Sequence, residues 1–283
     1  MRIPRAAMEA FKFSALISWR STGKQQQTIA RCIEKTGRAL HSGDLSTVRI
    51  WPELAGTGSV RTVEHLLSAL EGTGVDNCRI EIMNSGSDDT SVEVPIFDGS
   101  AREWVEAIDQ VGLTDAMDCN GRSCDRVAPY LTQPVHVSKG DSVIAAFPAN
   151  ETNISYGIDF PQVSDLSLKW YSSSFCTGSF YSKQIAPSRT FCIYEEVEKM
   201  RSAGLIKGGS AENAVAFSIS KGLLNPPLRS LEEPCRHKVL DFIGDVSLFA
   251  RRGSQGLPVA NIIAFKGGHS LHAEFVRKLS STS

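Results

Sequence analysis

The segment 236–245, with the sequence RHKVLDFIGD, carries the side chains whose spacing is best suited to chemistry. Residues four apart lie on one face of a helix, so His237, Asp241 and Asp245 would form a single stripe. A neutral imidazole and a carboxylate one turn apart can together bind zinc, which accepts nitrogen and oxygen donors at about 2.0–2.2 Å. An exposed His–Asp pair on a solvated helix has the same spacing, and the segment taken alone favours this simpler interpretation.

A third protein ligand is required if zinc is to keep an open position for water. The candidate is His65, although a histidine in an apolar helix such as 62–67 is by default a core residue. Its neighbour Glu64 strengthens the metal interpretation, because successive helix residues diverge by about 100° and Glu64 could flank the ion without binding it. A carboxylate beside metal-activated water is the arrangement of a general base. The alternative is that Glu64 is a surface acid stabilised by a helix N-terminus.

His269 follows a β-rich run and two glycines, Gly267 and Gly268. Glycines allow a sharp turn or close approach to a ligand, and a histidine can act as an acid near neutral pH. An exposed loop histidine is the simpler alternative. The sequence contains no GxSxG, no GxGxxG and no GxxxxGK followed by Ser or Thr. A serine nucleophile, dinucleotide binding and nucleotide hydrolysis therefore gain little support.

The composition of the chain is that of an ordinary globular protein. Of its 283 residues, 41% are hydrophobic and 22% are charged, which excludes a disordered chain. The net charge of −1 gives no support for nucleic-acid binding, and no apolar run is long enough for a spanning helix. The seven cysteines are scattered without a CxxC pair, which indicates reduced thiols rather than a disulfide framework.

Residues 1–24 differ in composition from the rest of the chain. Against the single acid Glu9 they carry five basic residues, which are Arg2, Arg5, Lys12, Arg20 and Lys24. An Arg-rich, acid-poor amphipathic segment is typical of an organellar presequence, and its low content of Ser and Thr favours the mitochondrion over the plastid. The alternative is a disordered tail.

The order of predicted elements is similar in the two halves of the remaining chain. Each half contains strands, a helix with a histidine near its start, a glycine-rich break and a further strand, with the helices over 60–72 and 234–250. We therefore predict an α+β fold of two similar domains, each a sheet packed with helices. The predicted bounds are 25–118 and 127–283, joined by a polar linker at 119–126.

Seven segments, in this order along the chain, match the motifs of one known family. They are TGRALHSG (36–43), VRTVEHLLSALEGTGVDNCRIEI (60–82), VPIFDGSA (94–101), SRTF (188–191), GLIKGGS (204–210), RHKVLDFIGD (236–245) and AFKGGHSL (264–271). Taken together, they resemble the zinc-dependent UDP-3-O-acyl-N-acetylglucosamine deacetylases of lipid A biosynthesis. They span most of the chain after residue 24, and with the presequence the chain is similar to the plant organellar form of this enzyme.

The resemblance implies two α+β domains with the active site and a zinc ion at their junction. His65, His237 and Asp241 match the zinc ligands of the family, and Glu64 and His269 match its catalytic glutamate and histidine. The implied reaction is amide hydrolysis, in which zinc activates water and polarises the acetamide carbonyl. Glu64 takes a proton and His269 donates one to the leaving amine, so that acetate and a free glucosamine amine are formed.

Five further positions match residues around the reacting carbonyl and the substrate. Asp245 matches the carboxylate that orients the catalytic histidine, and Lys238 and Thr190 match groups near the carbonyl. Phe191 matches an aromatic residue that contacts substrate, and Lys266 matches a lysine near the diphosphate. The implied partner is an acylated UDP-N-acetylglucosamine. We expect peripheral membrane contact through its acyl chain, a monomeric protein and no nucleic acid.

One departure from the family pattern lies between Thr57-Gly58 and the helix that carries Glu64. Family members have several strands there, whereas Ser59-Val60-Arg61 joins the two almost directly in this chain. The first sheet is therefore expected to lack strands near 58–60 and to expose unpaired edges. An alternative function follows, namely a catalytically impaired isoform or paralogue of the deacetylase that acts as a binding or regulatory protein.

The presequence interpretation predicts where a fused reporter protein is found in the cell. Residues 1–24 should carry the reporter into mitochondria, because import depends on the positive charge of the segment. Replacing Arg2, Arg5 and Arg20 by Glu should leave the reporter in the cytosol, as judged by fluorescence microscopy. A reporter that stays cytosolic behind the intact segment would refute the interpretation.

Overall fold

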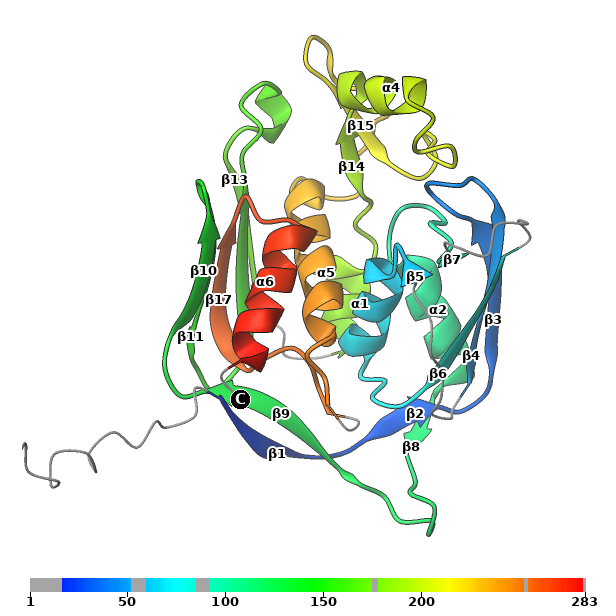
Figure 1. The fold of residues 1–283 in the computed structure, drawn as a ribbon, viewed down its shortest axis with the longest axis vertical. Coiled ribbons are helices and arrows are strands. Elements are labelled where there is room, and N and C mark those ends of the chain that lie inside the picture. The colour runs from blue at the N-terminus through cyan, green and yellow to red at the C-terminus, as the bar shows by residue number, and fades with distance from the viewer. Residues whose placement is uncertain (1–16, 52–59, 85–91, 175–177, 252–253, 282–283) are drawn as a thin grey trace, which may run out of the picture.

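The computed structural model describes residues 17–51, 60–84, 92–174, 178–251 and 254–281. Four helices lie side by side between a five-stranded sheet and a three-stranded sheet (Figure 1). The helices are α1 (Glu64–Thr73), α2 (Arg102–Val111), α5 (Glu233–Ser247) and α6 (His269–Ser280). This arrangement of sheets packed against helices confirms the predicted α+β class. No helix of the described part is both long and apolar enough to cross a membrane.

The second half of the chain forms the five-stranded sheet. All neighbouring strands are antiparallel except β12 and β17, which are parallel. Side chains alternate along the strands, so Ile144, Tyr156 and Ile262 are buried while the other face is exposed. The strands of Ile144 and Tyr156 contact α6 and α5, respectively. The strand order is β10 (Val135–Lys139), β11 (Ser142–Pro148), β17 (Ala260–Phe265), β12 (Asn153–Ile158) and β13 (Lys169–Ser174).

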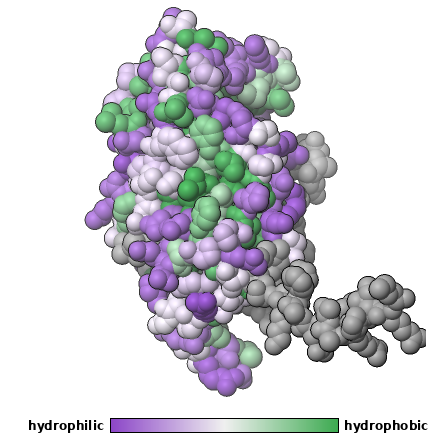
Figure 2. Space-filling model, turned by 90° about the vertical axis from the view of Figure 1, so that its left-hand side faces the viewer, coloured by the Kyte–Doolittle hydropathy of each residue, from purple (hydrophilic) through white to green (hydrophobic). Residues whose placement is uncertain are grey.

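The exposed face of this sheet carries several apolar side chains, and Figure 2 shows them gathered near the centre of that face. Phe147, Trp170 and Ile263 are each more than 40% exposed. The ring of Trp170 stacks on that of Phe265 with 5.4 Å between their centres. Both rings cover Gly157, where a β-carbon would lie 2.6 Å from the indole. The sheet thus buries one face and exposes the other, as sheets rich in antiparallel pairs commonly do.

The first half of the chain forms the smaller sheet, in the order β3 (Ile33–Arg38), β4 (Leu45–Trp51) and β6 (Arg79–Asn84), with antiparallel pairs throughout. Its connectivity repeats that of β10, β11 and β17. In each half a hairpin pairs with a third strand, β6 or β17, which follows one helix and precedes another. Among the described residues, β12 and β13 have no counterpart in this sheet. Most of the junction at 58–60 lies outside the described residues, so the loss of strands there stays a prediction.

A two-stranded antiparallel ribbon runs beneath the helices (Figure 1). It pairs β1 (Ile17–Gln25) with β9 (Asp125–Leu131) and β2 (Gln27–Ile29) with β8 (Leu113–Asp115). The expected presequence boundary at residue 24 falls inside β1, where Ile17 is buried and Trp19 stacks on Phe249. The predicted presequence 1–24 therefore overlaps a strand of the fold, while residues 1–16 lie outside the described residues, and the presequence stays a prediction. The end of the expected linker 119–126 likewise belongs to β9.

The remaining elements are short. Two of them, β14 and β15, form a parallel pair that carries α4 at one end of the molecule, and β5 and β7 form another parallel pair beside α1 (Figure 1). Their bounds are β5 (Val60–Arg61), β7 (Val92–Glu93), α3 (Gly178–Phe180), β14 (Phe191–Ile193), α4 (Tyr194–Ser202), β15 (Val215–Ser218) and β16 (Gly222–Leu223). Short helical turns occupy Ser164–Leu166 and Tyr181–Ile185.

Helices α1 and α5 approach each other backbone to backbone. A β-carbon on Gly244 of α5 would lie 2.1 Å from the carbonyl oxygen of Glu64 and 3.1 Å from its α-carbon. Only glycine permits such an approach, because any side chain would push the start of α1 away. The contact therefore sets the distance between His65, which follows Glu64, and the polar face of α5.

Replacing Gly244 by Ala should force α1 and α5 apart. We expect a loss of about 1–3 kcal/mol in the free energy of unfolding, as for other overpacked cores, together with weaker metal binding because His65 moves away from α5. Urea denaturation of the metal-free protein and a zinc titration measure the two effects. The matched control is Gly178→Ala, where the new β-carbon would lie 3.8 Å from the nearest atom of another residue. Equal effects of the two substitutions would contradict the role of the close contact.

Candidate metal centre and active site

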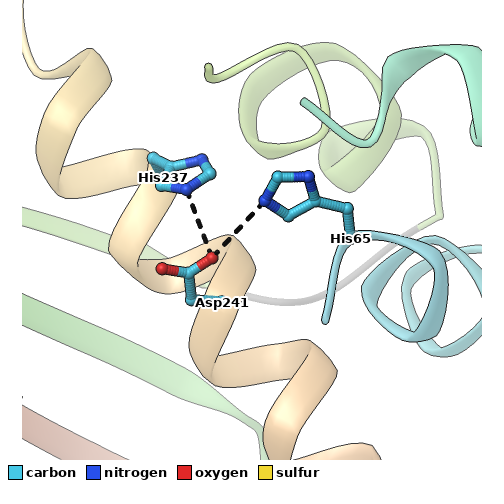
Figure 3. A group of neighbouring side chains, drawn as sticks. All are labelled: His65, His237 and Asp241. Atoms are coloured by element: carbon cyan, nitrogen blue, oxygen red, sulfur yellow. Dashed lines mark ion pairs between the residues drawn. The ribbon is translucent and has the colours of Figure 1, made fainter. Parts of the chain in front are cut away.

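Three buried side chains from α1 and α5 converge on one point (Figure 3). His237 and Asp241 lie one turn apart on α5, and His65 lies in the first turn of α1. Asp241 Oδ1 is 3.2 Å from His237 Nε2 and 3.7 Å from His65 Nε2. The three residues are 1–4% exposed. The predicted stripe on α5 and the predicted third residue on α1 are thus brought together.

The start of α1 is fixed by a buried carboxylate. Thr62, two residues before the helix, adopts a left-handed backbone with φ 57° and donates a hydrogen bond from its hydroxyl to Glu93. Glu93 is itself buried and also accepts the amide of Ser42. These contacts fix where the chain enters α1, and with it the position of His65.

A second buried carboxylate fixes the start of α5. Glu233 accepts hydrogen bonds from the main-chain amide and the guanidinium of Arg189. This ties segment 188–191 to the helix and places the carbonyl oxygen of Ser188 3.0 Å from His237 Nδ1. Because a carbonyl only accepts, Nδ1 of His237 donates this hydrogen bond, and Nε2 is the nitrogen that faces Asp241.

The protonation states of His65 and Asp241 suit a cation. Burial, and next the neighbouring His237, lower the pKa of His65 to about 3, so its imidazole is neutral at pH 7. Burial alone would raise the pKa of Asp241, but His237 and Lys238 hold it well below its usual value. Oδ2 of Asp241 accepts a hydrogen bond from Lys238, whereas Oδ1 is buried without a partner among the described residues.

This donor set fits a divalent metal. The ligand atoms of His65, His237 and Asp241 all lie within 4.8 Å of one another. Two imidazoles and one carboxylate are three protein ligands that suit catalytic zinc, with a fourth position left for water. A bound cation would also satisfy Oδ1 of Asp241, since a buried anionic oxygen without a partner is costly.

Glu64 lies at the first position of α1, next to His65. Burial raises the pKa of its carboxyl group, and the negative charge of Asp241 raises it further. A carboxylate whose pKa is raised toward neutrality is better matched to accept a proton at physiological pH.

His269 begins α6, and its Nδ1 lies 2.7 Å from Oδ2 of Asp245. The hydrogen bond to Asp245 raises the pKa of His269 to about 9. The imidazole is therefore cationic at neutral pH, although its side chain is 55% exposed. Asp245 follows Asp241 by one turn of α5, so the predicted stripe reaches from His237 and Asp241 to this histidine.

Of the residues expected near substrate, Lys238 lies on α5 itself. The ammonium group of Lys238 is 5.5 Å from the centre of the Phe191 ring, and Lys238 and Lys266 both line a cavity of about 130 Å³. Lys266 forms ion pairs with Asp141 and Asp159. Thr190 is held through its main chain, which accepts the amide of Val215 and donates to Gly99, and its hydroxyl has no partner among the described residues.

Comparison with known proteins decides the family. The model of the LpxC family, described as UDP-3-O-acyl N-acetylglycosamine deacetylase, matches residues 58–281. The chain is 49% identical to the probable mitochondrial UDP-3-O-acyl-N-acetylglucosamine deacetylase 1 of Arabidopsis thaliana, over 94% of this chain and 91% of that protein. It is 39% identical to the deacetylase of Trichormus variabilis, over 92% of this chain and 99% of that protein.

The chain belongs to the LpxC family. Members of this family are metalloenzymes, which agrees with the convergent donors of His65, His237 and Asp241. The alignment with the Arabidopsis protein spans 298 positions, whereas 94% of 283 residues is about 266, so about 32 positions of that protein have no counterpart here.

One residue near the LpxC site escaped the sequence analysis. His272 is buried, and its Nδ1 lies 2.6 Å from the same oxygen of Asp245 that contacts His269. The available signal was its spacing, because His269 and His272 are three apart on one helix and so share a face. The partner of His272 could not be identified from spacing within α6, since Asp245 is on another helix.

The donor set predicts that metal stabilises the folded protein. Exhaustive chelation should lower the melting temperature and remove bound zinc, and added zinc should restore both, because a ligand at 100 times its Kd stabilises by about 2.7 kcal/mol. His237→Ala should abolish this response, whereas His136→Ala, on the exposed face of β10, should keep it. Scanning fluorimetry and elemental analysis provide the measurements. An unchanged melting temperature after complete removal of metal would exclude a metal bridge between α1 and α5.

Proposed function

We propose that this chain is a zinc-dependent hydrolase of lipid A biosynthesis. It removes the N-acetyl group from UDP-3-O-(3-hydroxyacyl)-N-acetylglucosamine and releases acetate and the free amine. Membership of the LpxC family supports the substrate class. The observation that carries the proposal is the convergence of His65, His237 and Asp241 on one unsatisfied carboxylate oxygen.

Zinc held by these three residues would supply an activated water and polarise the acetamide carbonyl. Glu64 then accepts the proton of the attacking water, for which its raised pKa prepares it. Lys238 and the hydroxyl of Thr190 donate to the oxygen of the carbonyl as negative charge develops there. The free hydroxyl of Thr190 supports this assignment, since it has no described partner to give up.

His269 donates a proton to the leaving amine. Asp245 keeps its imidazole cationic and fixes its orientation through Nδ1, so Nε2 is the nitrogen left to act on substrate. His269 is therefore assigned as the acid and Glu64 as the base. The two groups lie on α6 and α1, on either side of the face of α5 that holds Asp241 and Asp245.

Substrate is bound around the cavity between Lys238 and Lys266. Lys266 is assigned to the diphosphate, which would take the place of its present carboxylate partners, Asp141 and Asp159. Phe191 offers an aromatic face to the sugar or acyl group. We propose that the acyl chain brings the protein, acting as a monomer, to a membrane surface, and that no nucleic acid is involved.

We further propose that the protein acts in the mitochondrion. The Arabidopsis relatives are named as mitochondrial, which supports organellar localisation of this chain. The presequence at residues 1–24 stays a prediction, and so does the preference for the mitochondrion over the plastid. So does the division into domains 25–118 and 127–283. The impaired-isoform alternative has no specific support, because the proposed ligands and proton-transfer residues are all retained in a convergent geometry.

The pH dependence of deacetylation tests the assigned acid and base. The profile of kcat/KM should be bell-shaped, with an acidic limb from Glu64 and a basic limb near pH 9 from His269. Glu64→Gln and His269→Ala should each lower kcat on the order of 10²-fold and retain zinc. Asp245→Asn should move the basic limb toward the ordinary histidine value of about 6.5, because the imidazolium loses its anionic partner.

The outcome for His269→Ala decides the assignment of the acid. Near-normal turnover with an unchanged basic limb would show that another group donates the proton. Absence of deacetylation by zinc-loaded wild-type protein would instead contradict the proposed function itself.

A further inference from the structure

Asp245 is the centre of a hydrogen-bonded chain that continues away from the proposed active site. Its Oδ2 contacts Nδ1 of both His269 and His272, at 2.7 and 2.6 Å. On the far side, Nε2 of His272 lies 2.8 Å from the hydroxyl of Tyr156 on β12. We propose that His272 and Tyr156 are positioning residues, which hold Asp245 so that it orients His269. The inference rests on the proposed function of His269 as the acid.

The direction of each hydrogen bond follows from the protonation of the groups. Burial alone would raise the pKa of Asp245, but its hydrogen bonds to His269 and His272 lower it, so the carboxylate is ionised and only accepts. Both Nδ1 atoms therefore carry protons. Burial lowers the pKa of His272, which leaves Nε2 as an acceptor, and burial raises the pKa of Tyr156 so that its phenol donates. Both ring nitrogens of His272 and the hydroxyl of Tyr156 therefore have a hydrogen-bond partner.

Packing leaves the side chains of His272 and Tyr156 little freedom to move. His272 and Tyr156 are fully buried, and the ring of Phe242 on α5 meets that of His272 edge to face with 5.2 Å between their centres. Gly267, in the turn before α6, comes so close that a β-carbon there would lie 2.5 Å from the Tyr156 hydroxyl and 3.3 Å from His272 Nε2. The sheet, α5 and the turn before His269 thus meet at the Tyr156–His272 pair.

The series of hydrogen bonds from Tyr156 to His269 has one buried end and one exposed end. His272 is 0% exposed, whereas the side chain of His269 is 55% exposed, and its ring meets that of His272 edge to face with 6.0 Å between their centres. A shared carboxylate oxygen is the link through which the buried pair can orient the exposed imidazole. The ligand atoms of Asp245, His269 and His272 are also close enough for a metal. The protons on both Nδ1 atoms point at Asp245, however, and this favours a hydrogen-bonded relay over a second metal site.

The test is an NMR titration that measures the pKa of the His269 imidazole in the zinc-loaded protein. The His269 signals are assigned by their loss in His269→Ala. The titratable groups that face His269 are Asp241 and Asp245 on α5, Glu64 and His65 on α1, and His272 on its own helix. All of them except His272 remain in the variants. His272→Phe removes the donor to Asp245 while keeping a planar ring. Since His272 is neutral, its loss changes no charge, and the pKa of His269 should fall from about 9 toward its ordinary value only because Asp245 is no longer held.

Two conservative variants provide the controls. His272→Asn keeps a donor in the place of Nδ1 and should leave the pKa of His269 near 9. Tyr156→Phe removes only the hydroxyl and should lower the pKa in the same direction as His272→Phe, by less. An unchanged or raised pKa of His269 in His272→Phe would overturn the proposal. If His272→Phe does not unfold cooperatively, Tyr156→Phe decides in its place, and an unchanged pKa there also overturns it.

Deacetylation provides an independent arm. His272→Phe should lower kcat about 10-fold or more, as for a displaced proton donor, with KM little changed. In a His269→Ala background the same substitution should have no further effect on kcat, because His272 acts only through His269. An equal loss in both backgrounds would show a general structural role and overturn the proposal. If wild-type protein shows no deacetylation, the proposed function fails, while the NMR titration still tests the relay.

Discussion

The close contact of α1 with α5 is the constraint on which the rest of the site depends. Gly244 lies against the backbone of Glu64, so the helices meet without an intervening side chain. His65 and the polar face of α5 are then near enough for two imidazoles and a carboxylate to share one point. Helices separated by ordinary side chains lie 8–10 Å apart, and the first turn of α1 could not reach Asp241 as closely from there. Sequence positions far apart become one donor set through this contact.

Helix α5 organises the site along a single face. His237, Asp241 and Asp245 follow one another at intervals of one turn, and each has a different partner that fixes its orientation. The carbonyl of Ser188 orients His237, Lys238 neutralises one oxygen of Asp241, and two histidines share one oxygen of Asp245. Three similar polar positions thereby acquire separate properties. The first two favour cation binding, and the third raises the pKa of His269 so that a proton is available next to the metal site.

The amino-acid sequence predicts which residue types form this site better than it predicts contacts between segments far apart in the chain. The helical stripe 237, 241, 245 follows from period alone, and the α+β class follows from alternating strands and helices. The role of His272 does not, because its partners Asp245 and Tyr156 come from a different helix and a strand. Residues 17–24 carry the charge of a presequence, yet they pair with β9, a contact more than a hundred residues away that no local pattern reveals. The need for glycine at position 244 likewise arises only from the neighbouring helix.

The central claim is that the contact between α1 and α5 creates a zinc site from His65, His237 and Asp241. Its most direct test is anomalous diffraction at the zinc absorption edge from crystals of protein purified with zinc. We expect one peak in contact with Nε2 of His65, Nε2 of His237 and Oδ1 of Asp241. No peak at that point, or a peak on Asp245, His269 and His272 instead, would contradict it.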